Sequence, residues 1–175
     1  MPSTKDDQRP DWIWAAGIEP RDDLDRLLDG DDGWRTLRER YGRSTRIHAS
    51  AGLVAKILTP RGPLRRVRRA CGGDPLAHEF ASLQEAASRG LPVTPPLALR
   101  RGADETTMVT AALKAAPLSA ASLDEDALAR GVGALVARLH AAGLLHGDLV
   151  RGNILVGATA SAGGPELALS DLRRC

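Results

Sequence analysis

The segment HGDLVRGN, residues 146–153, carries side chains whose types and spacing suit chemistry on a phosphate group. Asp148 and Asn153 have four residues between them, and both follow a helix-patterned segment that ends at Gly143. Phosphoryl transfer needs an oxygen that orients the incoming hydroxyl group, which a carboxylate such as Asp148 can provide. It also needs oxygen ligands for Mg²⁺, which the Asn153 amide can supply together with a second carboxylate. The alternative is a turn in which both side chains only bond local backbone groups.

Two other segments offer the remaining groups of such a site. Asp171 lies in LALSDL, at the end of a strand expected after the loop, and is the candidate second Mg²⁺ ligand. Lys56 lies inside the apolar strand LVAKIL, in a chain with only three lysines among its 24 basic residues. A buried lysine requires a carboxylate partner, whereas a lysine at a strand edge can extend to solvent. If Lys56 is buried, its first candidate partner is Glu79 in the next predicted helix, and Glu85 is the second.

The order of these motifs resembles the protein-kinase-like superfamily. The resemblance rests on Lys56, Glu79, LHAAGLLHGDLVRGNILV and LALSDLRR, and it extends from about residue 35 to residue 175. Two stretches, HEFASLQEAASRGLPVTPPLAL and SDLRR, are similar more narrowly to bacterial lipopolysaccharide core kinases, which phosphorylate heptose or Kdo sugars. The resemblance implies that ATP and Mg²⁺ are the cofactors.

The resemblance implies roles for the residues of the loop and of the segment after it. Asp148 would be the catalytic base or would orient the acceptor hydroxyl group. His146, also in the catalytic loop, would brace that loop. Asn153 and Asp171 would bind Mg²⁺.

The resemblance also implies roles upstream, with one departure. Lys56 would hold the nucleotide phosphates and Glu79 would position the lysine. No G-x-G-x-x-G motif precedes Lys56, however, and RYGRSTRIHASAG offers only Gly42 and Gly52. Backbone amide groups could still bind phosphate there.

The function that the resemblance implies is an ATP- and Mg²⁺-dependent phosphotransferase of lipopolysaccharide biosynthesis, acting on a sugar hydroxyl group of a lipopolysaccharide-type glycolipid. The alternatives are an aminoglycoside-type small-molecule kinase, an atypical Ser/Thr protein kinase, and a non-catalytic, truncated kinase-like remnant. In the family, further helices follow the second aspartate, whereas the sequence ends four residues after Asp171. We therefore expect a C-terminally truncated chain. Truncation and the missing glycine motif favour the remnant, whereas retention of all four polar catalytic positions argues against it.

Hydrophobic patterning predicts the elements that must position these residues. Strands and helices do not alternate regularly, so we expect an α+β fold rather than a doubly wound parallel sheet. The predicted elements are a short helix and turn within 22–41, a hairpin at 45–58, a helix at 75–89, a strand at 106–113, a helix at 124–142, and a C-terminal hairpin formed by NILVGA and ELALSD.

The expected organisation is a kinase-like pair of lobes. The predicted parts are an N-terminal tail and short helix (1–33), a β-rich N-lobe with one main helix (34–113), a hinge or crossing segment (114–118), and a partial C-lobe of helix, catalytic loop and hairpin (119–175).

Composition places the chain among soluble globular proteins, with 43% hydrophobic and 26% charged residues and no stretch apolar enough for a transmembrane helix. The polar N-terminus does not resemble a secretory signal, and Cys71 and Cys175 match neither a disulfide framework nor a metal cluster, so we expect a cytoplasmic protein. Five arginines in 61–70 favour a solvated surface, or contact with phosphate or with an anionic membrane at its inner face. The expected partners are a nucleotide and a sugar or glycolipid acceptor, and we expect no nucleic acid.

Overall fold

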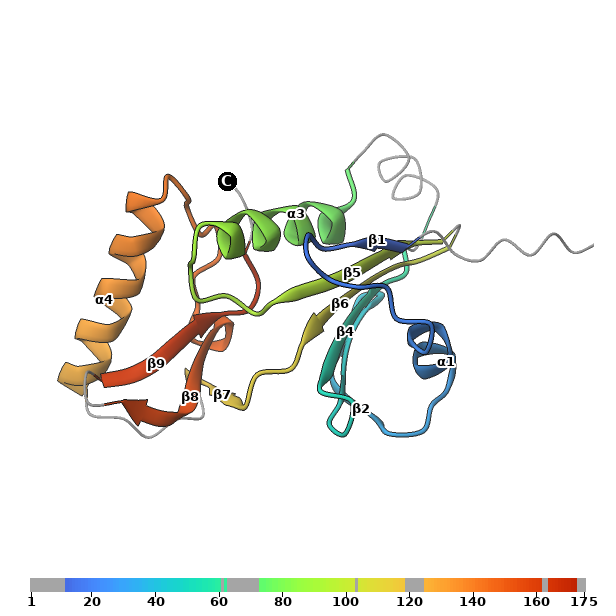
Figure 1. The fold of residues 1–175 in the computed structure, drawn as a ribbon, viewed down its shortest axis with the longest axis horizontal. Helices are drawn as coiled ribbons and strands as arrows, with labels where there is room; N and C mark the ends of the chain where they lie inside the picture. Colours follow the sequence, from blue (N-terminus) through green and yellow to red (C-terminus); the bar gives the residue numbers. More distant parts are fainter. Residues whose placement is uncertain are drawn as a thin grey trace, which may run out of the picture.

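The computed structural model describes residues 12–60, 62, 73–102, 104–118, 125–161 and 164–172. Its first lobe is built on a six-stranded antiparallel sheet with the strand order β1-β5-β6-β4-β3-β2 (Figure 1). The strands are β1 (Trp12–Trp14), β2 (Trp34–Arg40), β3 (Arg43–His48), β4 (Leu53–Leu58), β5 (Pro96–Arg101) and β6 (Thr106–Ala111).

Helix α3 (Pro75–Ser88) begins and ends as its sequence predicts. Pro75 occupies the first turn, where its fixed φ suits a helix and its missing N–H group costs nothing. The Asp74 carboxylate caps this end by accepting the backbone N–H groups of Leu76 at 3.0 Å and Ala77 at 3.4 Å. Gly90, at φ +68°, follows the last turn in the left-handed conformation that favours glycine.

The two faces of the six-stranded sheet are covered by different helices. Helix α3 lies along β5 and β6, and its Leu83 shares a core with Met108 (Figure 1). The neighbouring Val109 points to the opposite face, where it packs with Leu24 of helix α1 (Leu24–Asp29). The alternation along β6 therefore feeds two separate apolar clusters, one under each helix.

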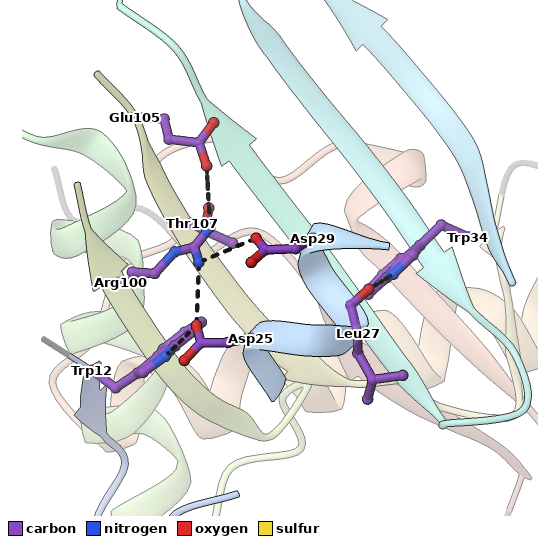
Figure 2. A network of polar contacts seen from close by, with 8 residues as sticks. All are labelled: Trp12, Asp25, Leu27, Asp29, Trp34, Arg100, Glu105 and Thr107. Carbon is purple, nitrogen blue, oxygen red and sulfur yellow. Dashed lines mark hydrogen bonds and ion pairs between the residues drawn. The ribbon is translucent and has the colours of Figure 1, made fainter. Parts of the chain in front are cut away.

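Polar contacts fix α1 and β1 to the sheet, as Figure 2 shows. Arg100 of β5 forms an ion pair with Asp25 of α1 at 3.2 Å, and the indole N–H group of Trp12 donates to the same carboxylate at 3.0 Å. Trp34 donates its indole N–H group to the carbonyl oxygen of Leu27 at 2.5 Å. These contacts tie helix α1 to both edge strands of the sheet, β1 and β2.

The prediction for residues 22–41 is correct only for its first half. Helix α1 ends at Asp29, and Trp34 and Leu37, which the helical spacing includes, lie in β2 instead. The reason is tertiary, since β2 pairs along its length with β3 and this pairing outweighs the local spacing. Strand β1, within the predicted tail and short helix, pairs with β5 and was missed for the same reason.

The second lobe is a three-stranded sheet with the order β7-β8-β9, packed against helix α4. Leu135 and Leu139 of the helix and Leu169 of β9 are buried in one core. Residues 115–117 of the predicted crossing segment form β7 and pair with β8. The elements are β7 (Ala115–Pro117), α4 (Glu125–Ala141), the 3₁₀ turn η2 (Arg151–Asn153), β8 (Ile154–Ser161) and β9 (Gly164–Leu169).

Hydrogen bonds join the two lobes. Leu169 of β9 accepts the N–H group of Thr94 at 2.8 Å and donates to the carbonyl oxygen of Pro92 at 2.9 Å. Arg138 of α4 donates to the carbonyl oxygen of Gly90 at 2.8 Å. One apolar core also contains residues of α3, α4 and β9, so the helix that carries Glu79 has a defined position relative to the second lobe.

The α+β fold and the other predicted elements are confirmed: the hairpin at 45–58, the helices at 75–89 and 124–142, the strand at 106–113 and the two C-terminal strands. The first eleven residues, nearly all of the arginine-rich segment 61–70 and both cysteines lie outside the described residues. Across the described part of the chain, no helix is both long and apolar enough to cross a membrane.

Candidate functional site

Five of the six predicted site residues line a single cavity of about 950 Å³. Its walls come from β2, β3, β4 and α3 of the first lobe, and from the loop before β8 and the residues after β9 of the second. The five residues are Lys56, Glu79, Asp148, Asn153 and Asp171. The sixth, His146, is not among the residues that line the cavity.

Lys56 and Glu79 form the ion pair that the sequence predicts. Lys56 Nζ on β4 contacts Glu79 Oε1 on α3, and the side chains are 19% and 6% exposed. Glu85, the second candidate, instead pairs with Arg89 one turn along the helix at 2.5 Å. The Glu79 carboxylate is thus the partner that the largely buried ammonium group requires.

Asp171 lies against this ion pair. Burial raises the pKa of Glu79 from its ordinary value of 4.5 to about 7, with Lys56 opposing the shift and the Asp171 carboxylate adding to it. The second lobe thus presents a carboxylate to the charged pair of the first lobe. Two neighbouring carboxylates and one ammonium group make a site whose charge balance a bound cation would improve.

The loop before β8 is held by its own hydrogen bonds. The Asn153 side-chain N–H group donates to the carbonyl oxygen of Asp148 at 2.9 Å, which leaves the amide oxygen of Asn153 as its acceptor group. The backbone N–H group of Asp148 donates to His146 Nδ1 at 3.2 Å. His146 therefore contacts the loop backbone from outside the cavity, whereas Asp148 and Asn153 lie on its wall.

The end of β9 is tied to the same loop. Ser170 donates its backbone N–H group to the carbonyl oxygen of Asn153 at 3.0 Å, and Leu172 is buried in the core. These anchors on both sides place Asp171 beside Asn153 at the cavity. The described residues contain no cluster of three or more His, Cys, Asp or Glu side chains suited to a metal ion. Two oxygen ligands nevertheless fit Mg²⁺, which keeps several of its waters when it binds.

Sequence reasoning missed one wall of the cavity. The hairpin of β2 and β3 contributes Arg38, Arg40 and Arg43, together with Tyr41 of its turn. Tyr41 and Gly42 have φ values of 51° and 75°, as a two-residue hairpin turn requires. The Tyr-Gly pair between two polar strands is the signal that could have revealed the hairpin.

Two solved structures are similar to this chain in fold. The structure of a Rio2 kinase–ADP/Mg²⁺–phosphoaspartate complex from Chaetomium thermophilum is similar, with a TM-score of 0.56 and 24% identity over 85% of this chain and 50% of that one. The bifunctional kinase-methyltransferase WbdD is similar with a TM-score of 0.52 and 22% identity, over 75% of this chain and 29% of that one. Both similarities show a protein-kinase-like fold, and the chain covers half or less of either protein. No curated protein matches significantly.

The family comparison covers the second part of the chain, including eight of the 18 residues that line the cavity. The model of the lipopolysaccharide kinase (Kdo/WaaP) family matches residues 65–175, which is more than half of the sequence. The matched region contains Glu79, Asp148, Asn153 and Asp171, whereas Lys56 and the β2–β3 hairpin precede it. The chain belongs to the lipopolysaccharide kinase (Kdo/WaaP) family.

Proposed function

We propose that the cavity binds ATP with Mg²⁺ and transfers the terminal phosphoryl group to a sugar hydroxyl group of a lipopolysaccharide-type glycolipid. The observation that carries this proposal is the convergence of Lys56, Glu79, Asp148, Asn153 and Asp171 on one cavity. Family membership supports the acceptor class. The ADP and Mg²⁺ of the similar Rio2 structure support the nucleotide and the ion.

The residues of the first lobe hold the nucleotide in this proposal. Lys56 places its ammonium group against the phosphates, where it offsets negative charge that builds up during transfer. Glu79 positions the lysine through their ion pair and does not contact the reacting atoms. Because both side chains are largely buried, the ammonium group is fixed before the nucleotide binds.

The residues of the second lobe act on the acceptor and the ion. The Asp148 carboxylate orients the sugar hydroxyl group and accepts its proton, as the hydroxyl oxygen bonds to the terminal phosphorus and the bond to ADP breaks. Asn153 and Asp171 hold Mg²⁺, which neutralises charge on the phosphate oxygens when it is bound. His146 keeps the loop in place through the backbone of Asp148.

The acceptor class also suggests where the protein works. A glycolipid acceptor stays anchored by its lipid, so we place the reaction in the cytoplasm at the inner face of the membrane. The five arginines of the segment 61–70 supply positive charge for an anionic lipid surface.

The replacement Asp148→Asn tests the proposed chemistry. It should abolish phosphate transfer from radiolabelled ATP to lipopolysaccharide core acceptor, while MgATP binding measured by calorimetry stays within about threefold of wild type, since the amide keeps the shape but accepts no proton. Asp126→Asn, the same change at an exposed position of α4, is the matched control and should retain activity. Full activity of the Asp148 variant would contradict its assignment, and absence of transfer by the wild-type chain would contradict the proposed function.

A further inference from the structure

Strand β2 changes the face that its side chains present partway along its length. Its register with β3 shifts between Thr36 and Arg38, so Leu37 is an extra residue in the strand. In a regular strand Thr36, Arg38 and Arg40 would share one face of the sheet. A β-bulge reverses this alternation, so both arginines lie on the face opposite to Thr36.

The bulge turns these arginines to the face of the sheet that borders the cavity. Arg38 is directly opposite Thr45 of β3, and Thr45 is opposite Lys56 of β4. These three residues form one row across three strands, and they share a face with the lysine that meets Glu79. Arg40 is opposite Arg43 in the next row, and all of these side chains line the cavity.

Within the described part of the chain, ion pairs do not balance the charge of the hairpin arginines. Among the described residues, no carboxylate forms an ion pair with Arg38, Arg40 or Arg43, and the last two face each other across the strands. Directly opposed like charges destabilise a strand pair. The phenol of Tyr41 contacts the Arg40 guanidinium group, with 3.5 Å between Nη2 and the hydroxyl oxygen, but brings no negative charge.

Two arginines on the opposite face of the same sheet are neutralised. Arg46 of β3 pairs with Asp31 at 3.6 Å, and Arg100 of β5 pairs with Asp25 at 3.2 Å. Among the described residues, carboxylates therefore pair with arginines on the face away from the cavity, whereas none pairs with the hairpin arginines on the cavity face. An anion in the cavity would balance the hairpin, since guanidinium groups bind phosphate oxygens through paired hydrogen bonds.

We propose that Arg38, Arg40 and Arg43 bind the polyphosphate chain of the nucleotide, taking the place of the backbone amides of a glycine-rich loop. The turn supports this assignment because Tyr41 and Gly42 alone connect the strands, and a two-residue turn has few N–H groups to offer a phosphate. The inference rests on the proposed function, since it assumes that the anion of the cavity is a nucleotide.

The test is a calorimetric titration of wild type and three double variants with MgATP, inorganic tripolyphosphate and adenosine. Arg38→Ala with Arg40→Ala should weaken binding of MgATP and tripolyphosphate about 100-fold, at roughly tenfold for each charged contact, and leave adenosine unchanged. Arg35→Ala with Arg101→Ala removes the same charge from exposed sites of the sheet that do not line the cavity, and should stay within about twofold of wild type. Arg38→Lys with Arg40→Lys keeps the charge and the fold, and should fall between these limits.

The possible outcomes distinguish a failure of this inference from a failure of the proposed function. If wild type binds MgATP and the alanine variant binds it equally well, the hairpin assignment is overturned and the kinase proposal stands. An unchanged affinity for MgATP with a raised KM for the glycolipid would assign the arginines to the acceptor and also overturn the inference. If wild type binds tripolyphosphate but not MgATP, and the variant loses it, the polyphosphate site stands and the nucleotide proposal fails. Binding of neither ligand by wild type overturns both.

Discussion

Asp74 connects the start of helix α3 to the sheet, and its replacement by alanine should destabilise the lobe that carries Glu79. The residue is 2% exposed, and its carboxylate accepts the backbone N–H groups of Leu76 at 3.0 Å and Ala77 at 3.4 Å. Its other oxygen accepts the hydroxyl group of Thr106 on β6 at 2.5 Å. One side chain therefore caps the helix and binds it to β6 of the sheet.

The expected loss of stability has two parts. Removing the cap of a helix N-terminus costs about 1 kcal/mol. Thr106 is fully buried, and leaving its hydroxyl group without this acceptor costs about 1–3 kcal/mol more. We therefore expect Asp74→Ala to lower the free energy of unfolding by about 3 kcal/mol, which for a chain of this size lowers the Tm by about 6–12 °C.

A double-mutant cycle with Thr106→Val tests this reasoning by urea denaturation. If the two side chains act through their shared hydrogen bond, Thr106→Val should cost at least about 1 kcal/mol less in the Asp74→Ala background than alone. Asp126→Ala, at an exposed site in the first turn of α4, is the control and should cost about 0.5 kcal/mol. Additive effects, or a loss below about 1 kcal/mol for Asp74→Ala, would refute the role assigned to Asp74.

Two further changes test the charged site and a tight turn. Burial and Asp171 raise the pKa of Glu79 from 4.5 to about 7. Between these pH values the folded state holds a proton that the unfolded state has lost. Metal-free wild type should therefore lose roughly 3 kcal/mol of stability as the pH rises from 4.5 through 7. Glu79→Gln should remove this loss in unfolding curves recorded from pH 4.5 to pH 8, and curves parallel to wild type would count against the pKa shift. Gly33→Ala should lower the Tm more than Gly52→Ala, because both have positive φ but only the Gly33 Cβ would lie 2.6 Å from a His48 ring atom. Equal Tm values for the two alanine variants would contradict that contact.

Local signals in the sequence were enough for most of the elements that carry the site. Pro75 and Gly90 mark the beginning and the end of α3. A lone lysine in an apolar strand implied a carboxylate partner on that helix. The Lys56–Glu79 pair was predictable because a buried charge is costly unless an opposite charge lies beside it. The loop was recognisable from the spacing of Asp148 and Asn153 along the chain, which needs no knowledge of distant contacts.

Features that depend on pairing between strands could not be predicted in this way. Strand β2 has the mostly polar sequence WRTLRER, which lacks the apolar alternation that indicates a strand. In the structure most of its residues are exposed. The bulge at Leu37 exists only in the register with β3, and without it the direction of Arg38 cannot be assigned. The contact between Asp171 and Glu79 likewise joins the two lobes, whereas local sequence patterns predict the elements of each lobe only by themselves.

The central claim is that the cavity binds ATP together with Mg²⁺, and thermal unfolding with and without the ion tests it most directly. At an ATP concentration about 100 times Kd, binding should add about 2.7 kcal/mol to the stability of the folded state, which raises the Tm by about 5–11 °C. This rise should need Mg²⁺, disappear with EDTA, and be strongly reduced in Asp171→Asn. A Tm that does not change with MgATP, or that rises equally without the ion, would contradict the account.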